Sequence, residues 1–332
     1  MPYRIHFTSQ DLARTRVAST AMPLVELAMA ARAFQDRSQP ARFDGWRRRV
    51  QTQSLTGGAR MVLSLYPAVG FSPTFLTPAH AGTAEEIMEN VRATPRKAIR
   101  AELATIAERQ AIPSWARRLP DDRDLYEEVC SGVGSLYSLL LEPYWDSITD
   151  LFAADRSVRM RQLLTGGVEN LLCQANPQWL RWEPPILELQ MPNRIDDDLF
   201  LEGQGVLLVP SVFRAHSIVD VDTLPQPLVS YPAGVEHPVH RLSALAPGRG
   251  STAVSALLGN TRAADLSVIA EHPGCSTKEL AAFAGISPPS ASEHATVLRQ
   301  AGLIHTRRHR NTALHSATHL GIALLNGWET PN

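Results

Sequence analysis

The polar side chains between residues 287 and 299 have the types and spacing that suit contact with the base edges of a DNA duplex. Ala291, Ala295 and Leu298 recur at spacings of four and three, which predicts a helix over 288–300 with one apolar face. Short polar side chains would then project outward from its first turns, and a helix of this kind fits the major groove. We predict that the following residues lie at this interface, Glu293 accepting a hydrogen bond from cytosine N4: Ser287, Pro289, Ser290, Ser292 and Glu293.

Basic residues on and after the same helix suit the phosphate backbone. Residues 303–307 and 312–315 predict two strands joined by residues 308–311, so that a basic wing covers about 304–315. From His294 to Trp328 the chain has four arginines, five histidines and no acidic residue. Cations in such a hairpin can reach phosphates. We predict that five side chains contact the DNA backbone: His294, Arg299, Arg307, Arg308 and Arg310.

The residues before this helix predict the element that positions it. Leu280 and Phe283 mark one face of a shorter helix, and Gly285 suits a turn because glycine adopts a positive φ most easily. Ser287 can cap the next helix, with Pro288 at its first position. This order of elements predicts a winged helix-turn-helix. The same pattern also occurs as a packing motif and in protein-interaction modules that do not bind DNA.

These residues resemble the winged-helix domain of the ArsR-type bacterial transcriptional regulators. The resemblance covers about the last 75 residues, and the wing departs from the pattern because His309-Arg310 stand at the usual glycine. The matching positions are Thr277, Leu280, Ala281, Gly285, Ile286, Ser287, Ser292, His294, Leu298, Ala301, Gly302, Leu303 and Ile304. Three upstream segments resemble long ArsR-type regulators that have an uncharacterised N-terminal domain: 7–16, 201–213 and 228–232. The resemblance implies a DNA-binding regulator and names no ligand.

Two apolar helix faces predict a homodimer. They lie at about 251–271 (Val254, Leu257, Leu258) and 317–327 (Leu320, Ala323, Leu324), and they exceed what so small a domain can bury alone. Two recognition helices would enter successive major grooves, so the expected operator is an inverted repeat in double-stranded DNA.

The first 250 residues predict an α+β region that is mainly helical with a small β-sheet. The predicted helices are 21–35, 84–93, 95–111, 121–142 and 144–164, and the predicted strands are 3–7, 186–189, 199–201, 205–209 and 227–231. Three proline and three glycine residues within 232–250 indicate a hinge. We therefore predict a sensory domain over 1–235, a linker over 236–250 and a winged helix-turn-helix domain over 251–332.

Composition excludes several classes of protein. The chain has 332 residues, 44% of them hydrophobic and 20% charged, with a formal net charge of −1, so two cores can form without a basic field over the whole protein. Its three cysteines are scattered and give no disulfide framework. No apolar run is long enough to span a membrane, and residues 1–7 do not resemble a signal peptide. We expect a soluble, cytoplasmic protein.

The upstream domain is predicted to bind a small-molecule effector, and three features bear on this. Aromatic residues concentrated between 115 and 213 either form a ligand pocket or, more commonly, fill a core. Arg14 and Arg16 either bind an acidic ligand or are structural. Residues 46–49, Trp-Arg-Arg-Arg, either touch DNA phosphates or form a solvated helix face.

Neither a metal, a cofactor nor an enzyme activity is predicted. The alternative for a metal is a zinc site built from His305, His309, His315 and His319. The alternative for an enzyme is an upstream catalytic domain with an appended winged helix for dimerisation. Residues 248–253 match a relaxed dinucleotide-binding motif, but a poor strand precedes them.

Overall fold

The computed structural model of the protein divides into two compact units. Unit 1 comprises residues 1–36 and 54–233, and unit 2 comprises residues 37–53 and 234–332. The mixture of helices with small sheets confirms the predicted α+β class. The predicted linker, 236–250, lies almost wholly outside the described residues. The structure describes residues 3–36, 40–78, 82–175, 180–190, 196–214, 218–220, 226–233, 250–309 and 312–325.

The first sheet of unit 1 joins the N-terminus to residues near 190. Its order is β3 (Leu180–Glu183), β4 (Ile186–Leu189), β1 (Tyr3–His6) and β5 (Asp198–Phe200). Strand β1 runs antiparallel to β4 and parallel to β5, so Ile5 lies opposite both Leu187 and Leu199. Ile5 and Leu187 are fully buried in the core of the unit, as the alternating pattern of the strands predicts.

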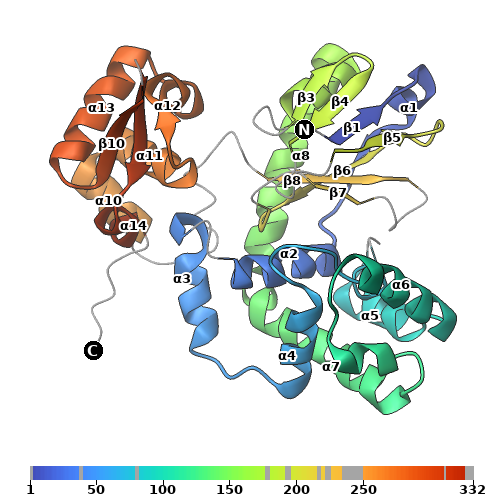
Figure 1. The fold of residues 1–332 in the computed structure, drawn as a ribbon. Helices are drawn as coiled ribbons and strands as arrows, with labels where there is room; N and C mark the ends of the chain where they lie inside the picture. The colour runs from blue at the N-terminus through green and yellow to red at the C-terminus, as the bar shows by residue number, and fades with distance from the viewer. Residues whose placement is uncertain are drawn as a thin grey trace. The chain divides into compact units, whose positions relative to one another are not determined.

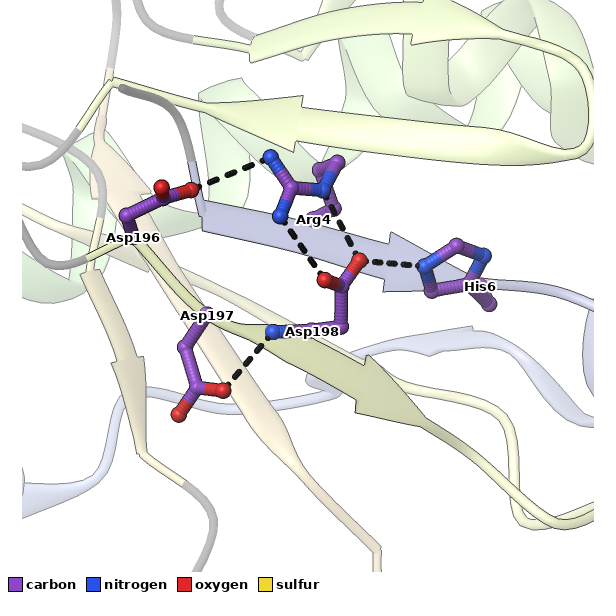
Figure 2. Close-up of polar contacts among 5 residues, drawn as sticks. All are labelled: Arg4, His6, Asp196, Asp197 and Asp198. Atoms are coloured by element: carbon purple, nitrogen blue, oxygen red, sulfur yellow. Dashed lines mark hydrogen bonds and ion pairs between the residues drawn. The ribbon is translucent and has the colours of Figure 1, made fainter.

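An ion-pair cluster on the outer face of this sheet fastens β5 to β1 (Figure 2). Asp198 accepts hydrogen bonds from both Arg4 Nε (2.8 Å) and Arg4 Nη2 (2.7 Å), and its Oδ1 lies 2.6 Å from His6 Nε2. Arg4 also contacts Asp196. The Arg4 guanidinium and the His6 ring hold the pKa of Asp198 well below its usual range. Because these charges satisfy one another at an exposed face, the cluster is a structural feature.

The second sheet has the order β2 (Arg16–Val17), β6 (Leu207–Ser211), β8 (Leu228–Pro232) and β7 (Ile218–Asp220). Strand β6 is parallel to β2 and β8, whereas β7 is antiparallel to β8. Gly203 and Gly205 both have positive φ and form the turn into β6. The two candidate ligand-binding arginines hold this region instead, since Arg14 donates to Gly203 O (2.9 Å) and Arg16 to Gln226 Oε1 (2.7 Å).

Helices make up the rest of unit 1 (Figure 1). They are α1 (Ser9–Arg14), α2 (Pro23–Gln35), α4 (Gly57–Leu65), α5 (Ala84–Arg92), α6 (Arg96–Arg109), α7 (Arg123–Leu140) and α8 (Trp145–Gln174). The sequence predicts α2, α5, α6 and α7 to within two residues at each end, but it misses α1 and α4. None of the helices among the described residues has both the length and the apolar character needed to cross a bilayer.

Helix α8 extends beyond its predicted end at 164 and bends at Gly166 and Gly167, where φ reaches −147° and 68°. A buried arginine joins the two halves, because Arg159 Nη1 donates to Gln174 O (3.0 Å) while Nη2 contacts Asp155 (3.1 Å). Asp155 also accepts from the hydroxyl of Tyr231 on β8 (2.7 Å). Because a buried charge is tolerated only with such partners, this network fixes the bend against the second sheet.

Unit 2 contains the winged helix and one helix from far upstream. Its elements are α3 (Pro40–Gln51), α10 (Gly250–Leu258), α11 (Asn260–Glu271), β9 (Cys275–Ser276), α12 (Thr277–Ala284), α13 (Pro288–Gln300), β10 (Ile304–His309), β11 (Thr312–Ala317) and α14 (His319–Leu325). Helix α3 packs against α11 and α14. Helix α3 is not among the helices that the sequence predicts. No local sequence pattern indicates that it packs with the C-terminal unit.

Helix α3 buries an aromatic stripe. Phe43, Trp46 and Val50 are each no more than 2% exposed, and Arg47 is buried beside Asp44, with Nη1 2.7 Å from Oδ1. The spacing of three and four places all of them on one side of the helix. Trp46 and Arg47 are therefore part of a packed face, so the interpretation of 46–49 as a DNA-contacting run fails for these two residues.

We expect Trp46→Ala to destabilise the winged helix although the residue lies more than 200 positions upstream of it. Removing a fully buried tryptophan costs about 3–5 kcal/mol. Hydrogen exchange should accelerate in α11 and α14, while the sheets of unit 1 keep their protection. Arg48→Ala, on the exposed side of the same helix, is the control. Unchanged exchange in α11 and α14 for Trp46→Ala would contradict this packing.

Candidate nucleic-acid interface

The turn between α12 and α13 has the geometry that the sequence predicts. A capping box opens α12, since Ser276 Oγ accepts from Glu279 N (3.2 Å) and Glu279 Oε2 accepts from Ser276 N (2.7 Å). Gly285 ends the helix with φ 65° and ψ 31°, in the left-handed region that glycine adopts most easily. The N–H of Ile286 then donates to Ala281 O (3.0 Å), which closes the turn.

Helix α13 begins and packs as predicted for a recognition helix. Ser287 accepts from the N–H of Ser290 (3.3 Å), and Pro288 occupies the first helical position, where its missing N–H costs nothing. Ala291, Ala295 and Leu298 are at most 3% exposed and belong to the same core as Leu266, Ile269 and Leu280. The small alanine side chains let α13 approach α11 and α12 closely (Figure 1).

The predicted base-contacting residues face solvent. Pro289, Ser292 and Glu293 are exposed, and Ser290 is half-buried because its hydroxyl lies 2.9 Å from the capping hydroxyl of Ser287. The structure adds Thr296 and Gln300 to this exposed face. The sequence prediction omits both, although they follow Ser292 and Glu293 at helical spacing and could have been found by extending the outward stripe by two turns.

His294 has a structural partner that the sequence does not indicate. Its Nδ1 forms a short hydrogen bond with Oδ2 of Asp265, a carboxylate on α11 that is 1% exposed. Burial raises the pKa of Asp265, and the hydrogen bond from His294 opposes this rise. The contact orients the imidazole so that Nε2 points away from Asp265. His294 thus links α13 to α11 through one ring nitrogen, and its predicted contact with the DNA backbone would have to use the other.

The wing is a tight antiparallel hairpin. Strands β10 and β11 pair from Ile304↔Ala317 to His309↔Thr312, and β9 pairs with β11 on its other side. The strands are longer than predicted. Arg308 pairs with Ala313 and His309 with Thr312, so both residues belong to β10 rather than to the connection. Arg307 and Arg308 are exposed, as a phosphate contact requires. Arg310 lies outside the described residues.

His315 is a core residue of the wing. It is 4% exposed, with Nδ1 2.9 Å from Thr306 Oγ1 and Nε2 2.9 Å from Thr277 Oγ1. Burial lowers its pKa, and the positive charge of Arg299 adds to that effect. Because threonine hydroxyls engage both ring nitrogens of His315, neither nitrogen is left to ligate a metal in the alternative zinc site. Within the described ranges, no three His, Cys, Asp or Glu side chains are grouped so as to hold a metal ion.

The charges on this surface come mostly from arginine. Lys278 and Arg299 are exposed on the two helices, in addition to the two wing arginines. The carboxylate of Glu279 is held by the capping box, and its hydrogen bonds from Ser276 lower its pKa. Glu293 is an exposed carboxylate on α13 that makes no part of this cap, and it stands beside the short neutral side chains of Pro289 and Ser292.

The comparison with known protein families agrees with this geometry. Residues 262–313 match the model of the MarR family, so 52 of the 332 residues form a winged-helix region similar to that of the MarR regulators. The match begins within α11 and ends in β11, and it includes α12, α13 and β10. It supports a DNA-binding transcriptional regulator in general terms. Searches of curated proteins and of solved structures found no significant match.

We expect the His294–Asp265 contact to contribute strongly to the placement of α13. His294→Ala leaves the buried Asp265 carboxylate without its partner, so we expect the free energy of unfolding to fall by about 3 kcal/mol. The double variant Asp265→Ala/His294→Ala removes both polar groups and should recover part of that loss. Urea unfolding of the wild type, both single variants and the double variant gives the coupling energy. Strictly additive losses would show that the pair does not interact.

Proposed function

We propose that the protein is a sequence-specific regulator of transcription that binds double-stranded DNA, and that it acts as a repressor. The observation that carries this proposal is the division of α13 into two faces. Ala291, Ala295 and Leu298 hold the helix against the core, while Pro289, Ser292 and Glu293 are exposed. Short side chains on an exposed helix start suit base edges in the major groove.

The wing and the ends of the two helices supply the sequence-independent part of binding. Arg307 and Arg308 are exposed on β10, and Arg299 is exposed on α13. Contacts from such cations to phosphates release counterions and make affinity fall with salt. Because the whole chain is close to neutral, with 32 Lys and Arg against 33 Asp and Glu, affinity must come from this local surface.

The proposed assembly is a homodimer on an inverted-repeat operator. Helices α10 and α14 pack together, with Val254 buried between elements of the unit. Leu257 on α10 and Leu320 on α14 remain 71% and 44% exposed. Exposed leucines on two neighbouring helices support a contact with a second copy, which would bring a second recognition helix into the next major groove.

The proposal also covers the type of regulator and the role of unit 1. The motif residues at the turn support an ArsR-type regulator, although the family model that matches is that of MarR. We propose that unit 1 binds a small-molecule effector and has no catalytic activity of its own. The competing functions are an enzyme dimerised by its winged helix and a winged helix that binds protein rather than DNA.

A gel shift separates these functions. The DNA upstream of the protein's own gene is titrated with the full chain at two salt concentrations, with an unrelated fragment of equal length as competitor. A regulator retains preference for the upstream fragment at the higher salt concentration. Equal affinity for both fragments at both salt concentrations would contradict sequence-specific binding, and absence of any shift would favour the protein-interaction or enzyme alternatives.

We expect variants of the wing arginines and variants of the exposed face of α13 to change DNA binding in different ways. Arg307→Ala and Arg308→Ala should weaken binding to all sequences alike and reduce the slope of log K against log salt by about 1 each. Ser292→Ala and Glu293→Gln should change the preference among operator sequences, with discrimination altered by about 1–3 kcal/mol at single base pairs. Fluorescence anisotropy against a set of operator variants at several salt concentrations measures both effects.

Lys97→Ala is the matched control, because it removes a cation from unit 1, outside the proposed DNA-binding surface. It should leave affinity, salt slope and sequence preference unchanged. If the wing and helix variants lost affinity in the same way, without a difference in salt slope or in preference, the assignment of separate roles would be wrong.

A further inference from the structure

A concave site lies among the helices of unit 1, lined mainly by apolar side chains with polar atoms also exposed between them. It occupies about 200 Å³ between the end of α4, the loop 67–73 and the end of α6. Its walls include Leu65, Leu103, Ile106 and Ile112, and three prolines complete them: Pro67, Pro73 and Pro113. Leu65, Leu103 and Ile106 are also part of the buried interior, so the floor of the site is continuous with packed side chains.

Polar contacts hold the loop that forms one wall. Arg32 on α2 donates to the carbonyls of Pro67 (3.0 Å) and Gly70 (2.9 Å). Gln110 pairs with the backbone of Phe71 in both directions, accepting from its N–H (2.8 Å) and donating to its C=O (2.7 Å). Glu102 accepts from the N–H groups of Thr74 and Phe75. Side chains of α2, of α6 and of the residue that caps α6 thus hold this loop and the two residues after it in place.

The lining determines which chemistry can enter. Among the described residues, no charged side chain lines this site. Its two polar side chains are already engaged, because Gln110 is paired with Phe71 and Ser64 Oγ donates to Met61 O (2.7 Å). A charged ligand would lose water without gaining a charged partner from the lining, which costs several kcal/mol. An uncharged, apolar molecule does not pay this desolvation penalty.

The size and the rim of the site indicate how large that molecule is. A cavity of about 150 Å³ lined by apolar side chains holds one benzene molecule, so about 200 Å³ accommodates a single ring with a small substituent. Val69 is 73% exposed and Phe71 is 37% exposed, both on the loop that forms the wall. The Arg109 guanidinium lies over the Phe71 ring, 5.1 Å from its centroid, whereas a ring seated in the site would cover the exposed side chain of Val69.

We propose that this site binds an uncharged, apolar compound of about one ring. The binding site stands by itself, whereas its role as the effector site rests on the proposed function. Unit 1 holds both the site and α2, whose Arg32 fixes the wall, so occupation of the site bears directly on that helix.

The test uses the full chain with toluene as the probe and benzoate as a charged probe of similar size. Ligand-observed saturation-transfer NMR measures binding. Ala111→Trp places a large side chain at an exposed position of the lining, so it fills the site without disturbing the core. Ala104→Trp adds the same side chain at an exposed position of α6 outside the lining.

We expect toluene to bind the wild type and the Ala104→Trp variant alike, and to bind Ala111→Trp at least ten-fold more weakly. Benzoate should bind at least ten-fold more weakly than toluene to the wild type. Absence of toluene binding, or equal binding to the two tryptophan variants, would overturn the site. Benzoate binding as tight as that of toluene would overturn the uncharged class. A gel shift with toluene then separates the proposals, because toluene binding without any change in DNA affinity would refute the effector role alone.

Discussion

The placement of the recognition helix depends on a very small contact surface. Helix α13 buries two alanines and one leucine, so it gains much less from apolar burial than a helix with larger side chains would. The close approach that small side chains allow offsets only part of this smaller apolar burial. The hydrogen bond between His294 and the buried carboxylate of Asp265 adds a directional contact between α13 and α11. The polar pair adds to the apolar contacts in fixing the rotation of the helix, and under the proposed function this rotation decides which side chains meet the bases.

The polar side chains of α13 divide into those that cap the helix and those that do not hold it in place. Ser287 and Ser290 are needed for the cap, whereas Pro289, Ser292 and Glu293 make no such contribution. The residues that hold the helix and the residues that can read DNA are therefore largely different. A sequence can change its base preference through the second group at little cost in stability, which is the expected arrangement for a selective DNA-binding surface.

The sequence predicts features that depend on local spacing and fails where distant segments meet. The two faces of α13, the turn at Gly285 and the wing follow from periodicity and capping chemistry over a few residues. The His294–Asp265 pair spans 29 positions on two helices, and no local signal marks it. Helix α3 is the clearest failure, since its arginine run is typical of a solvated face, yet Trp46 and Arg47 are buried by tertiary packing. Of the aromatic residues between 115 and 213, Phe152, Trp182 and Phe213 are buried in cores, whereas Phe200 is 64% exposed. The cavity is lined by proline-containing segments elsewhere.

The chain passes from one unit to the other three times. The chain passes between them at residues 36 and 37, 53 and 54, and 233 and 234, so α3 belongs to the winged-helix unit while α2 and α4 belong to the other. Arg32 and Gln35, in the last turn of α2, hold the loop and the helix end beside the apolar site. Helix α3 is the next helix in the sequence, and it packs on α11, which carries Asp265. Packed contacts alone do not establish coupling, because coupling requires an element with two arrangements that both sites favour differently. Helix α3 therefore belongs to the winged-helix unit by packing although it lies between two helices of unit 1 in the sequence, and an effect of the apolar site on DNA binding remains part of the proposed effector role.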